Sequence, residues 1–241
     1  MIQAHRGASA CRPENTLEAF AVAIEQGADG IELDVHLTKD GEIVVAHDAR
    51  LERISNGTGY VNDHTLKELK SLEISDFPSA IPPYRIPTLS EVFSLVKPSG
   101  LFVNVELKTT ERLYPELPAK LLALAGEYAM GERVIYSSFN HYSLKEIKTR
   151  DPKARIGLLY ELGMVDPWVY ANYVGADAIH PHYLVIAALP ETVALCHEHG
   201  VKVNVWTVDD PDAIKLMLKY AVDGIITNKP ETVVMCRDGV I

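Results

Sequence analysis

Short apolar runs alternate with segments of helical periodicity along most of this chain, and this alternation is the strongest constraint on its fold. The runs are rich in Val, Ile and Leu, as in parallel strands that are buried on both faces. Strands that alternate with helices favour a parallel sheet with helical crossovers. We predict strands at residues 3–6, 30–34, 101–107, 134–137, 155–160, 176–179, 201–205 and 224–226.

Helical segments separate these strands and also end the chain. In the first of them, Asn15 is the expected N-cap, because Glu18 three residues later can complete a capping box, and Gly27 ends the helix. Another helix begins after His141. The other predicted helices lie at residues 89–96, 117–128, 167–173, 190–199, 212–218 and 229–236.

Eight strand–helix units are the number of a parallel β/α (TIM) barrel. An open, doubly wound sheet is the alternative, but no glycine-rich dinucleotide-binding turn follows the first strand. We therefore expect residues 1–241 to form a single barrel domain. Residues 49–86 interrupt the alternation with an NGTG turn, a short helix at 66–72 and prolines at 78, 82 and 83. Such a segment is too short for a core of its own, so we predict a small cap inserted after strand 2.

The second strand and the hairpin that follows it, residues 29–48, carry an unusual set of polar residues. Glu32 and Asp34 alternate with apolar residues and therefore share one face of the strand. Two carboxylates about 4 Å apart repel each other by roughly 4 kcal/mol at an effective dielectric of 20, so a cation or a shared proton is needed. The returning strand ends in His47 and Asp48. A solvent-facing hairpin with polar residues outside is the competing interpretation.

Polar residues also end the other predicted strands, where β/α barrels place their chemistry. Three carboxylates that converge from neighbouring strands, those of Glu32, Asp34 and Glu106, predict a site for one divalent cation. Oxygen ligands favour Mg²⁺ or Ca²⁺ over zinc. The alternative is a network of ion pairs with Arg6 and Lys108. The polar strand ends are His5 and Arg6, Asn104 to Lys108, His180, Trp206, and Thr227 with Asn228.

His5 and His47 are the candidate proton-transfer residues, because imidazole titrates near neutral pH. Together with a divalent ion, Arg6 and Lys108 could hold a phosphate. Trp206 could pack against an apolar or glycerol-like part of a ligand, although a buried core tryptophan is nearly as common.

Other polar residues are assigned structural roles. His197 and His199 point apart on their helix, and nothing marks Ser9 or Cys11 as a nucleophile. His36, His180 and His182 could contact the substrate or orient the residues that do so. A structural role is favoured for each.

Composition limits the partners and the compartment. The net charge of −10 argues against nucleic acid or an anionic membrane surface as the main partner. Three cysteines, an odd number without metal-type spacing, suit a reducing cytoplasm. No apolar run is long enough to insert into a membrane, and the N-terminus lacks a secretory signal. The oligomeric state stays open, with a homo-oligomer as one possibility.

The segments HRG (5–7), PENT (13–16), GADGIELDVHLTKDGEIVVAHD (27–48), VNVELK (103–108) and VWTV (205–208) resemble those of the glycerophosphodiester phosphodiesterases of bacterial cytoplasm. The resemblance spans nearly the whole chain and implies a β/α barrel with a small inserted cap. It places the metal carboxylates on Glu32, Asp34 and Glu106, and the catalytic histidines on His5 and His47. It places the phosphate-binding cations on Arg6 and Lys108. Asp209 departs from the family, which often has Asn after the WTV run.

The reaction implied by the resemblance is hydrolysis of a glycerophosphodiester, a small molecule, to sn-glycerol 3-phosphate and an alcohol. The divalent ion and Arg6 would hold the phosphate, while His5 and His47 act as acid and base on opposite sides of phosphorus. Attack by the glycerol 2-hydroxyl through a cyclic phosphate and direct attack by water stay open. Alternatives are a lysophospholipase D or sphingomyelinase D-like headgroup hydrolase, or a non-catalytic barrel that binds metal or phosphate.

Overall fold

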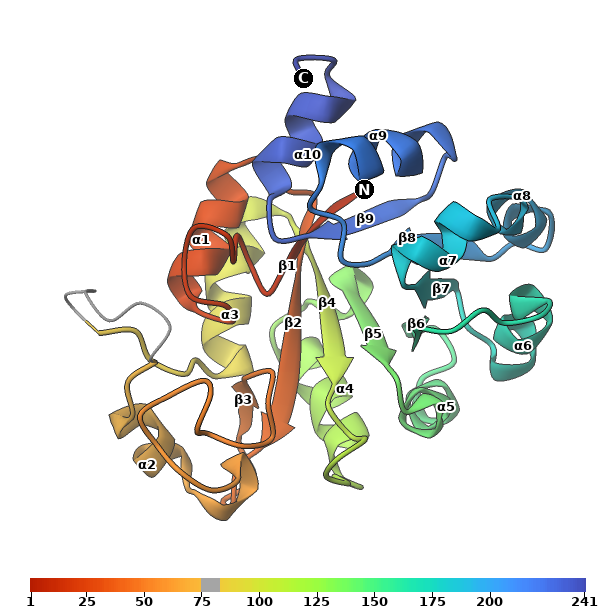
Figure 1. Ribbon diagram of the computed structural model, residues 1–241. Coiled ribbons are helices and arrows are strands. Elements are labelled where there is room, and N and C mark those ends of the chain that lie inside the picture. Colours follow the sequence, from red (N-terminus) through yellow and green to blue (C-terminus); the bar gives the residue numbers. More distant parts are fainter. Residues whose placement is uncertain (75–82) are drawn as a thin grey trace.

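The computed structural model describes residues 1–74 and 83–241. Its centre is a closed barrel of eight parallel strands surrounded by helices, which confirms the predicted β/α barrel (Figure 1). The barrel closes through the pairing of β1 with both β2 and β9. The barrel strands are β1 (Ile2–His5), β2 (Gly30–Leu37), β4 (Phe102–Leu107), β5 (Val134–Ser138), β6 (Arg155–Tyr160), β7 (Ala178–Pro181), β8 (Lys202–Val205) and β9 (Gly224–Thr227).

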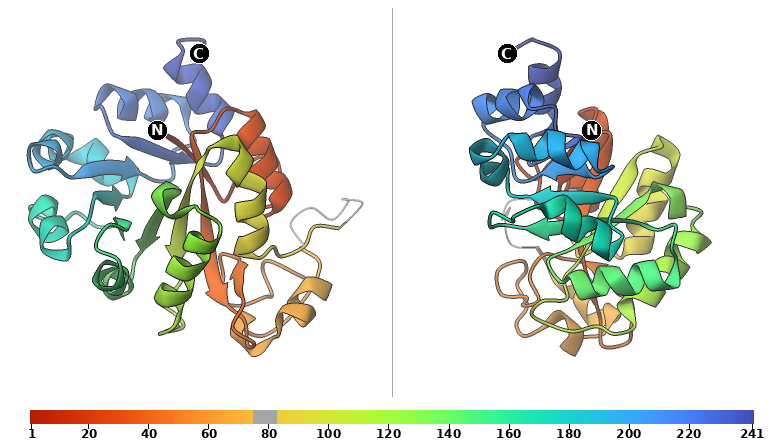
Figure 2. Two further views of the ribbon diagram at one scale, coloured as in Figure 1. Left: turned by 180° about the vertical axis from the view of Figure 1, so that it is seen from behind. Right: turned by 90° about the vertical axis from the view of Figure 1, so that its right-hand side faces the viewer.

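The helices lie around the outside of the barrel in all three views of Figures 1 and 2. They are α1 (Leu17–Glu25), α2 (Leu66–Ser71), α3 (Leu89–Val96), α4 (Leu117–Glu127), α5 (His141–Arg150), α6 (Pro167–Val174), α7 (Tyr183–Ala188), α8 (Glu191–Glu198), α9 (Pro211–Lys219) and α10 (Pro230–Arg237), with short 3₁₀ helices η1 (Val61–Asp63), η2 (Lys97–Ser99) and η3 (Gly131–Arg133).

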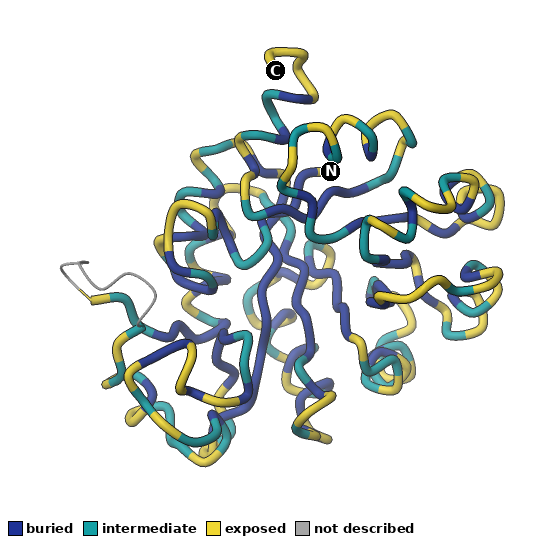
Figure 3. Tube along the Cα trace, in the orientation of Figure 1, coloured by how far each residue is buried: buried dark blue, intermediate teal, exposed yellow. Residues whose placement is uncertain are grey.

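The apolar faces of strands and helices meet in one large core. Ile31, Leu33 and Val35 of β2 are each fully buried in it, as their alternation with Glu32 and Asp34 predicts. The buried tube along β2, β4 and β5 runs through the middle of Figure 3. The opposite faces of the strands point into the barrel and carry several buried polar side chains: Gln3, Asn104, Ser137, His180 and Asn204.

A short strand, β3 (Ile43–Val45), pairs antiparallel with the end of β2 and confirms the predicted hairpin. The inserted segment packs against the hairpin in a small apolar cluster separate from the main core: Val44, Ala46, Leu51, Ile54, Val61, Leu69 and Ile86. Helix α2, in the lower left of Figure 1, belongs to this segment. Pro78 and Pro82, two of the three prolines noted in this segment, lie outside the described residues.

Three local predictions are wrong. The N-cap of α1 is Thr16, whose side chain accepts from the Ala19 backbone N–H, because Asn15 has a left-handed φ of 58° and its side chain turns into the barrel. Strand β7 begins and ends two residues later than predicted. Helix α7 was not predicted between β7 and α8, because its six residues are too short for a clear helical period.

Candidate active site

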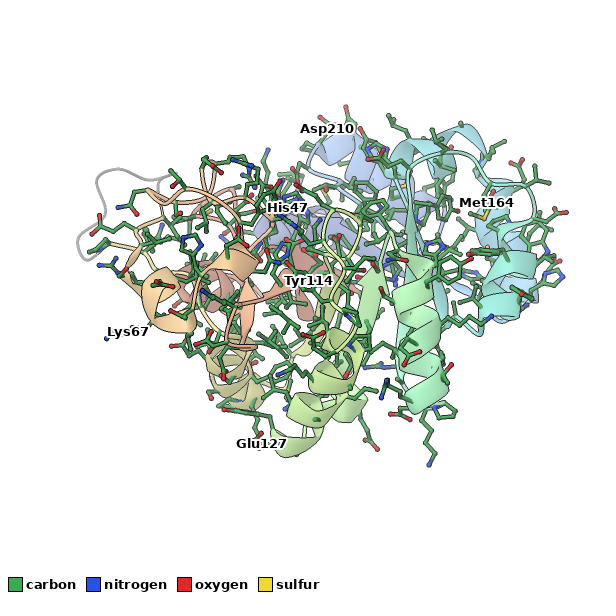
Figure 4. All side chains as sticks on the ribbon, turned by 90° about the horizontal axis from the view of Figure 1, so that it is seen from below. His47, Lys67, Tyr114, Glu127, Met164 and Asp210 are labelled. Atoms are coloured by element: carbon green, nitrogen blue, oxygen red, sulfur yellow. The ribbon has the colours of Figure 1, made fainter. Side chains whose placement is uncertain are left out.

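The C-terminal ends of the barrel strands surround a cavity of about 270 Å³. Figure 4 views the molecule from below Figure 1, the side to which β2 and β4 point. His47 lies well inside the outline in that view, whereas Lys67 and Glu127 lie at its edge. The cavity is lined by His5, Arg6, Glu32, His47, Asn104, Glu106, Lys108, Ser137, Phe139, Leu159, Glu161, Trp206 and Ile226. These include every sequence-predicted site residue except Asp34.

Glu32, Asp34 and Glu106 form a buried acidic triad at this cavity. Each offers a carboxylate oxygen, and these three oxygens lie within 4.8 Å of one another. The strand register explains the proximity, since Asp34 and Glu106 are direct neighbours in the parallel pairing of β2 with β4. The three side chains point to the same side because Glu32 and Asp34 are two residues apart on one strand.

The triad strongly perturbs the protonation of its own members. Burial, followed by the charges of Asp34 and Glu106, raises the pKa of Glu32 well above its usual value. Burial and Asp34 raise the pKa of Glu106 to about 7. Burial would also raise the pKa of Asp34, but Lys108 and Arg6 outweigh it and hold that pKa below its usual value.

Two cations pair with the triad, as the alternative interpretation of the sequence required. Lys108 Nζ lies 2.8 Å from Glu106 and 3.5 Å from Asp34, and Arg6 Nε lies 3.4 Å from Asp34. These two charges do not balance three carboxylates, and Arg6 also pairs with Glu14 at 2.8 Å. The uncompensated negative charge adds to burial, the larger cause, in raising the pKa values of Glu32 and Glu106. A set of carboxylate oxygens with unbalanced charge fits a hard divalent cation, so the donor set matches the predicted metal site.

His47 follows strand β3 and is oriented by a carboxylate. Its Nδ1 lies 2.6 Å from Asp48 Oδ1, and Arg53 holds both oxygens of Asp48 at 2.6 and 2.9 Å. Arg53 also donates to Glu14 at 2.7 Å. Burial lowers the pKa of His47, while the charge of Asp34 and the bond to Asp48 oppose that shift.

His5 ends strand β1 and is oriented by an amide. Its Nδ1 lies 2.7 Å from Asn228 Oδ1, a residue at the other end of the chain that β9 brings alongside β1. Burial lowers the pKa of His5 to about 4, with a further lowering by Arg6, so the ring is neutral at pH 7. The two histidines therefore reach one cavity with different partners.

The other side of the cavity is less polar. Phe139 packs edge-on against Trp206 with ring centroids 5.5 Å apart, and Leu159 lines the wall nearby. The Trp206 indole N–H donates to the backbone carbonyl of His180 at 2.7 Å, so the ring is fixed and half-buried rather than part of the core. Opposite the charged groups, this wall suits an apolar or glycerol-like part of a ligand.

Comparisons with known proteins identify the family. The sequence pattern of the glycerophosphoryl diester phosphodiesterase family matches residues 5–232. The chain belongs to this family. As a member of the glycerophosphoryl diester phosphodiesterase family it is an enzyme, a phosphoric diester hydrolase.

Relatives cover nearly the whole chain. A glycerophosphodiester phosphodiesterase of Caldanaerobacter subterraneus subsp. tengcongensis is 48% identical over 97% of this chain and 96% of its own. One of Bacillus altitudinis is 37% identical over 98% of each chain. A solved Oleispira antarctica phosphodiesterase in complex with the product sn-glycerol-3-phosphate is 27% identical, covers 99% of this chain and 96% of its own, and has a TM-score of 0.92.

In the described part of the chain, residues 1–74 and 83–241, none of the helices has the length and apolar character needed to cross a membrane. The three cysteines are free, with Cys11 exposed and Cys196 and Cys236 buried.

Several residues around the cavity were missed by sequence reasoning. Asn15, expected as a helix cap, donates from Nδ2 to Asp34 Oδ2 at 2.8 Å. Glu14, Asp48, Arg53 and Asp209 extend the hydrogen-bond network around Arg6, His47 and Asn228. Asp48 follows His47 directly, so its pairing could have been found. Asp209 was noted only as a departure from the family, and Arg53 carried no comparable signal.

The residues that were assigned structural roles lie elsewhere or outside the cavity wall. His197 pairs with Asp223 at 2.7 Å, and the His199 ring stacks on Trp168. His180 is fully buried inside the barrel, where its Nε2 lies 2.9 Å from Asn204 Nδ2. His36 contacts the backbone carbonyl of His47 at 3.2 Å, beneath that residue.

Proposed function

We propose that this chain hydrolyses glycerophosphodiesters to sn-glycerol 3-phosphate and an alcohol, with one divalent cation and with His5 and His47 as proton-transfer residues. One observation carries the proposal: a single cavity joins the acidic triad, two cations and both histidines. Membership in the family supports it, as does the product complex of the Oleispira antarctica relative.

Glu32, Asp34 and Glu106 would hold the cation, Mg²⁺ or Ca²⁺. When bound, the ion would act as a Lewis acid that neutralises charge on a phosphoryl oxygen. Arg6 and Lys108 bind the phosphate from the same side of the cavity, and their ion pairs with the triad hold them there before substrate arrives. Trp206 and Phe139 provide the wall against which the glycerol or the alcohol packs.

His5 and His47 exchange protons with the attacking and the leaving oxygen. Both line the cavity, and each has its Nδ1 engaged, so each turns Nε2 to the reacting groups. The attacking group is either the glycerol 2-hydroxyl, which gives a cyclic phosphate, or water. Rapid quench in ¹⁸O-water separates these routes: a cyclic product favours the first, and single-step entry of label without it favours the second.

We further propose that residues 1–241 act as a single catalytic domain, with residues 49–86 as an inserted cap. Arg53 of that segment donates to Asp48, the residue just before it, and Asp48 in turn orients His47. Free cysteines are compatible with a reducing cytoplasm.

The test is release of sn-glycerol 3-phosphate from a panel of glycerophosphodiesters, with chelator and then with each divalent ion restored. We expect turnover with Mg²⁺ or Ca²⁺ and none with chelator. His47→Gln should lower kcat by roughly 10²- to 10⁴-fold, the usual contribution of general acid–base catalysis. Exposed His199, far from the cavity wall, supplies the matched control His199→Gln. Faster turnover of lysophosphatidylcholine than of glycerophosphocholine would favour the lysophospholipase D alternative, and activity that survives chelation would contradict the metal site.

A further inference from the structure

Asp209 lies in the loop between β8 and α9 and reaches the loop after β9 with both of its carboxylate oxygens. Oδ1 accepts from the backbone N–H of Asn228 and from the Thr227 hydroxyl, each at 2.8 Å. Oδ2 accepts from Asn228 Nδ2 at 2.5 Å. Asp209 is not part of the cavity wall, yet it holds the side chain that contacts His5.

The direction of these hydrogen bonds is determined by what each group can do. A carboxylate only accepts, so the NH₂ group of Asn228 must face Asp209 and its amide oxygen must face His5. That oxygen lies 2.7 Å from His5 Nδ1 and also only accepts, so Nδ1 carries the proton. The neutral ring then leaves Nε2 with a free lone pair. Ser9 Oγ lies 2.7 Å from the same amide oxygen and 2.8 Å from the His5 backbone carbonyl, so its single proton has two acceptors and does not by itself decide the orientation.

We propose that Asp209 is a positioning residue that acts through the amide of Asn228 to fix His5 as the Nδ1-protonated tautomer. His5 Nε2 then enters the reaction as the proton acceptor in the cavity. The proposal rests on the proposed function only for the role of His5 in proton transfer. A carboxylate at position 209 sets this order because both of its oxygens only accept, whereas an amide there has one acceptor and one donor.

Asp209→Asn tests this order with almost no change in shape. The amide oxygen of the new Asn side chain would still accept from the backbone N–H of Asn228 and from the Thr227 hydroxyl. Its NH₂ group would therefore face the side chain of Asn228. The Asn228 amide must then turn its oxygen toward position 209 and its NH₂ group toward His5. We expect His5 to change to the Nε2-protonated tautomer and to lose its acceptor in the cavity.

The tautomer is read from ¹⁵N chemical shifts of the ring nitrogens in the magnesium-loaded protein labelled at histidine, with His5 identified by His5→Gln. Wild type should show a protonated Nδ1 and an unprotonated Nε2, and Asp209→Asn the reverse. The kcat of Asp209→Asn should fall by roughly 10²-fold or more, with KM changed less than about threefold, because a proton acceptor is lost and phosphate binding is not.

Two further variants separate this role from simple support of the loop. The double variant Asp209→Asn/Asn228→Asp exchanges the amide and the carboxylate, so the new carboxylate again accepts from His5 Nδ1; the wild-type tautomer and most of kcat should return. Asp210→Asn makes the same change at an exposed N-cap one residue away, where Asn caps as well as Asp. It should change neither the tautomer nor kcat.

An unchanged His5 tautomer in Asp209→Asn would overturn the proposal, whatever happens to kcat or thermal stability. A double variant that regains the tautomer without regaining kcat would also overturn it. If wild type turns over no glycerophosphodiester with any divalent ion, the proposed function fails, while the ¹⁵N comparison still decides the role of Asp209.

Discussion

Neutral amides and charged groups share the task of orienting the residues around the cavity. Asn15 donates to Asp34, and Asn228 accepts from His5, so each fixes an orientation without adding charge. Asp48 instead places a carboxylate on His47. A carboxylate partner stabilises an imidazolium, whereas an amide does not, so the two histidines differ in the charge state that their surroundings favour.

Asp48→Asn should therefore lower kcat by about 10- to 100-fold with little change in KM. The substitution retains the shape and a hydrogen-bond acceptor but removes the charge that stabilises protonated His47, together with the ion pair to Arg53. Steady-state kinetics on glycerophosphocholine measure both constants. The exposed turn residue Asp40 provides the control Asp40→Asn, which should behave as wild type. Equal kinetics for the two variants would contradict the role of Asp48.

His180 should make the folded state sensitive to acid. Burial lowers its pKa to about 3, whereas a histidine in the unfolded chain titrates near 6.5. Between these two pH values the unfolded state binds the extra proton, so stability is lost as pH falls from about 6.5 toward 3, by at most ~1.4 kcal/mol per pH unit.

Urea unfolding at pH 7, 6 and 5 tests this point. The free energy of unfolding of wild type should fall more steeply with decreasing pH than that of His180→Gln, which has no titrating ring. His199→Gln removes an exposed histidine and should retain the wild-type slope. Parallel slopes for wild type and His180→Gln would show that another group causes the acid sensitivity.

At the scale of single elements, the turn between β1 and α1 brings Arg6 to the cavity through a close backbone contact. Gly7 has a φ of +83°, and a Cβ atom there would lie 2.7 Å from the Ala19 backbone carbonyl carbon. The neighbouring Ala8 N–H donates to that same carbonyl at 2.9 Å. Only glycine allows α1 to approach this closely.

Gly7→Ala should lower thermal stability by several kcal/mol and also reduce activity, because the backbone of Arg6 must shift. Gly175 is the matched control: it has the same φ of +83°, but nothing lies within 4 Å of an added Cβ. Gly175→Ala carries only the left-handed strain, about 1–2 kcal/mol. Thermal denaturation and kcat are measured for both variants. Equal losses of stability in Gly7→Ala and Gly175→Ala would mean that the contact with Ala19 is unimportant.

The hairpin of β2 and β3 is the element that brings His47 to the acids. Val35 pairs with Val45, and the Ala46 N–H then donates to the Asp34 carbonyl at 3.0 Å, so the chain is held against β2 up to the residue before His47. His47 consequently lines the same cavity as Glu32, although fifteen residues of sequence separate them.

For the whole molecule, the acidic triad predicts that metal binding and stability are linked. An unbalanced set of buried carboxylates destabilises the metal-free folded state, and a cation bound there stabilises it by about 2.7 kcal/mol at a concentration 100 times Kd. For a chain of 241 residues this corresponds to an increase of about 5–10 °C in Tm.

Thermal denaturation with chelator, Mg²⁺ and Ca²⁺ measures this increase. Glu106→Gln should abolish most of it, and it should make the metal-free protein no less stable, since one member of a repelling set is removed. Glu111→Gln, on the loop beyond β4, is the control and should respond to metal as wild type does. A Tm that no divalent ion raises would contradict the metal site.

The barrel and most of the residues of the cavity wall could be predicted from local sequence patterns. Alternating apolar strands and helices specify parallel crossovers, and the alternation of Glu32 and Asp34 within β2 places both acids on one face, because side-chain direction in a strand depends only on local geometry. The family motifs then assigned the remaining candidate residues before any contact was known.

Most of the groups that orient these residues could not be predicted, because they come from distant parts of the chain. Asn228 and His5 are 223 residues apart along the chain. They are in contact because β1 and β9 pair when the barrel closes. The same closure brings Asp209 within hydrogen-bond distance of Asn228. The inserted segment supplies Arg53, which donates to Asp48. Hydrogen bonds of this kind join strand ends and loops that are far apart in sequence. A local pattern of residues therefore cannot predict them.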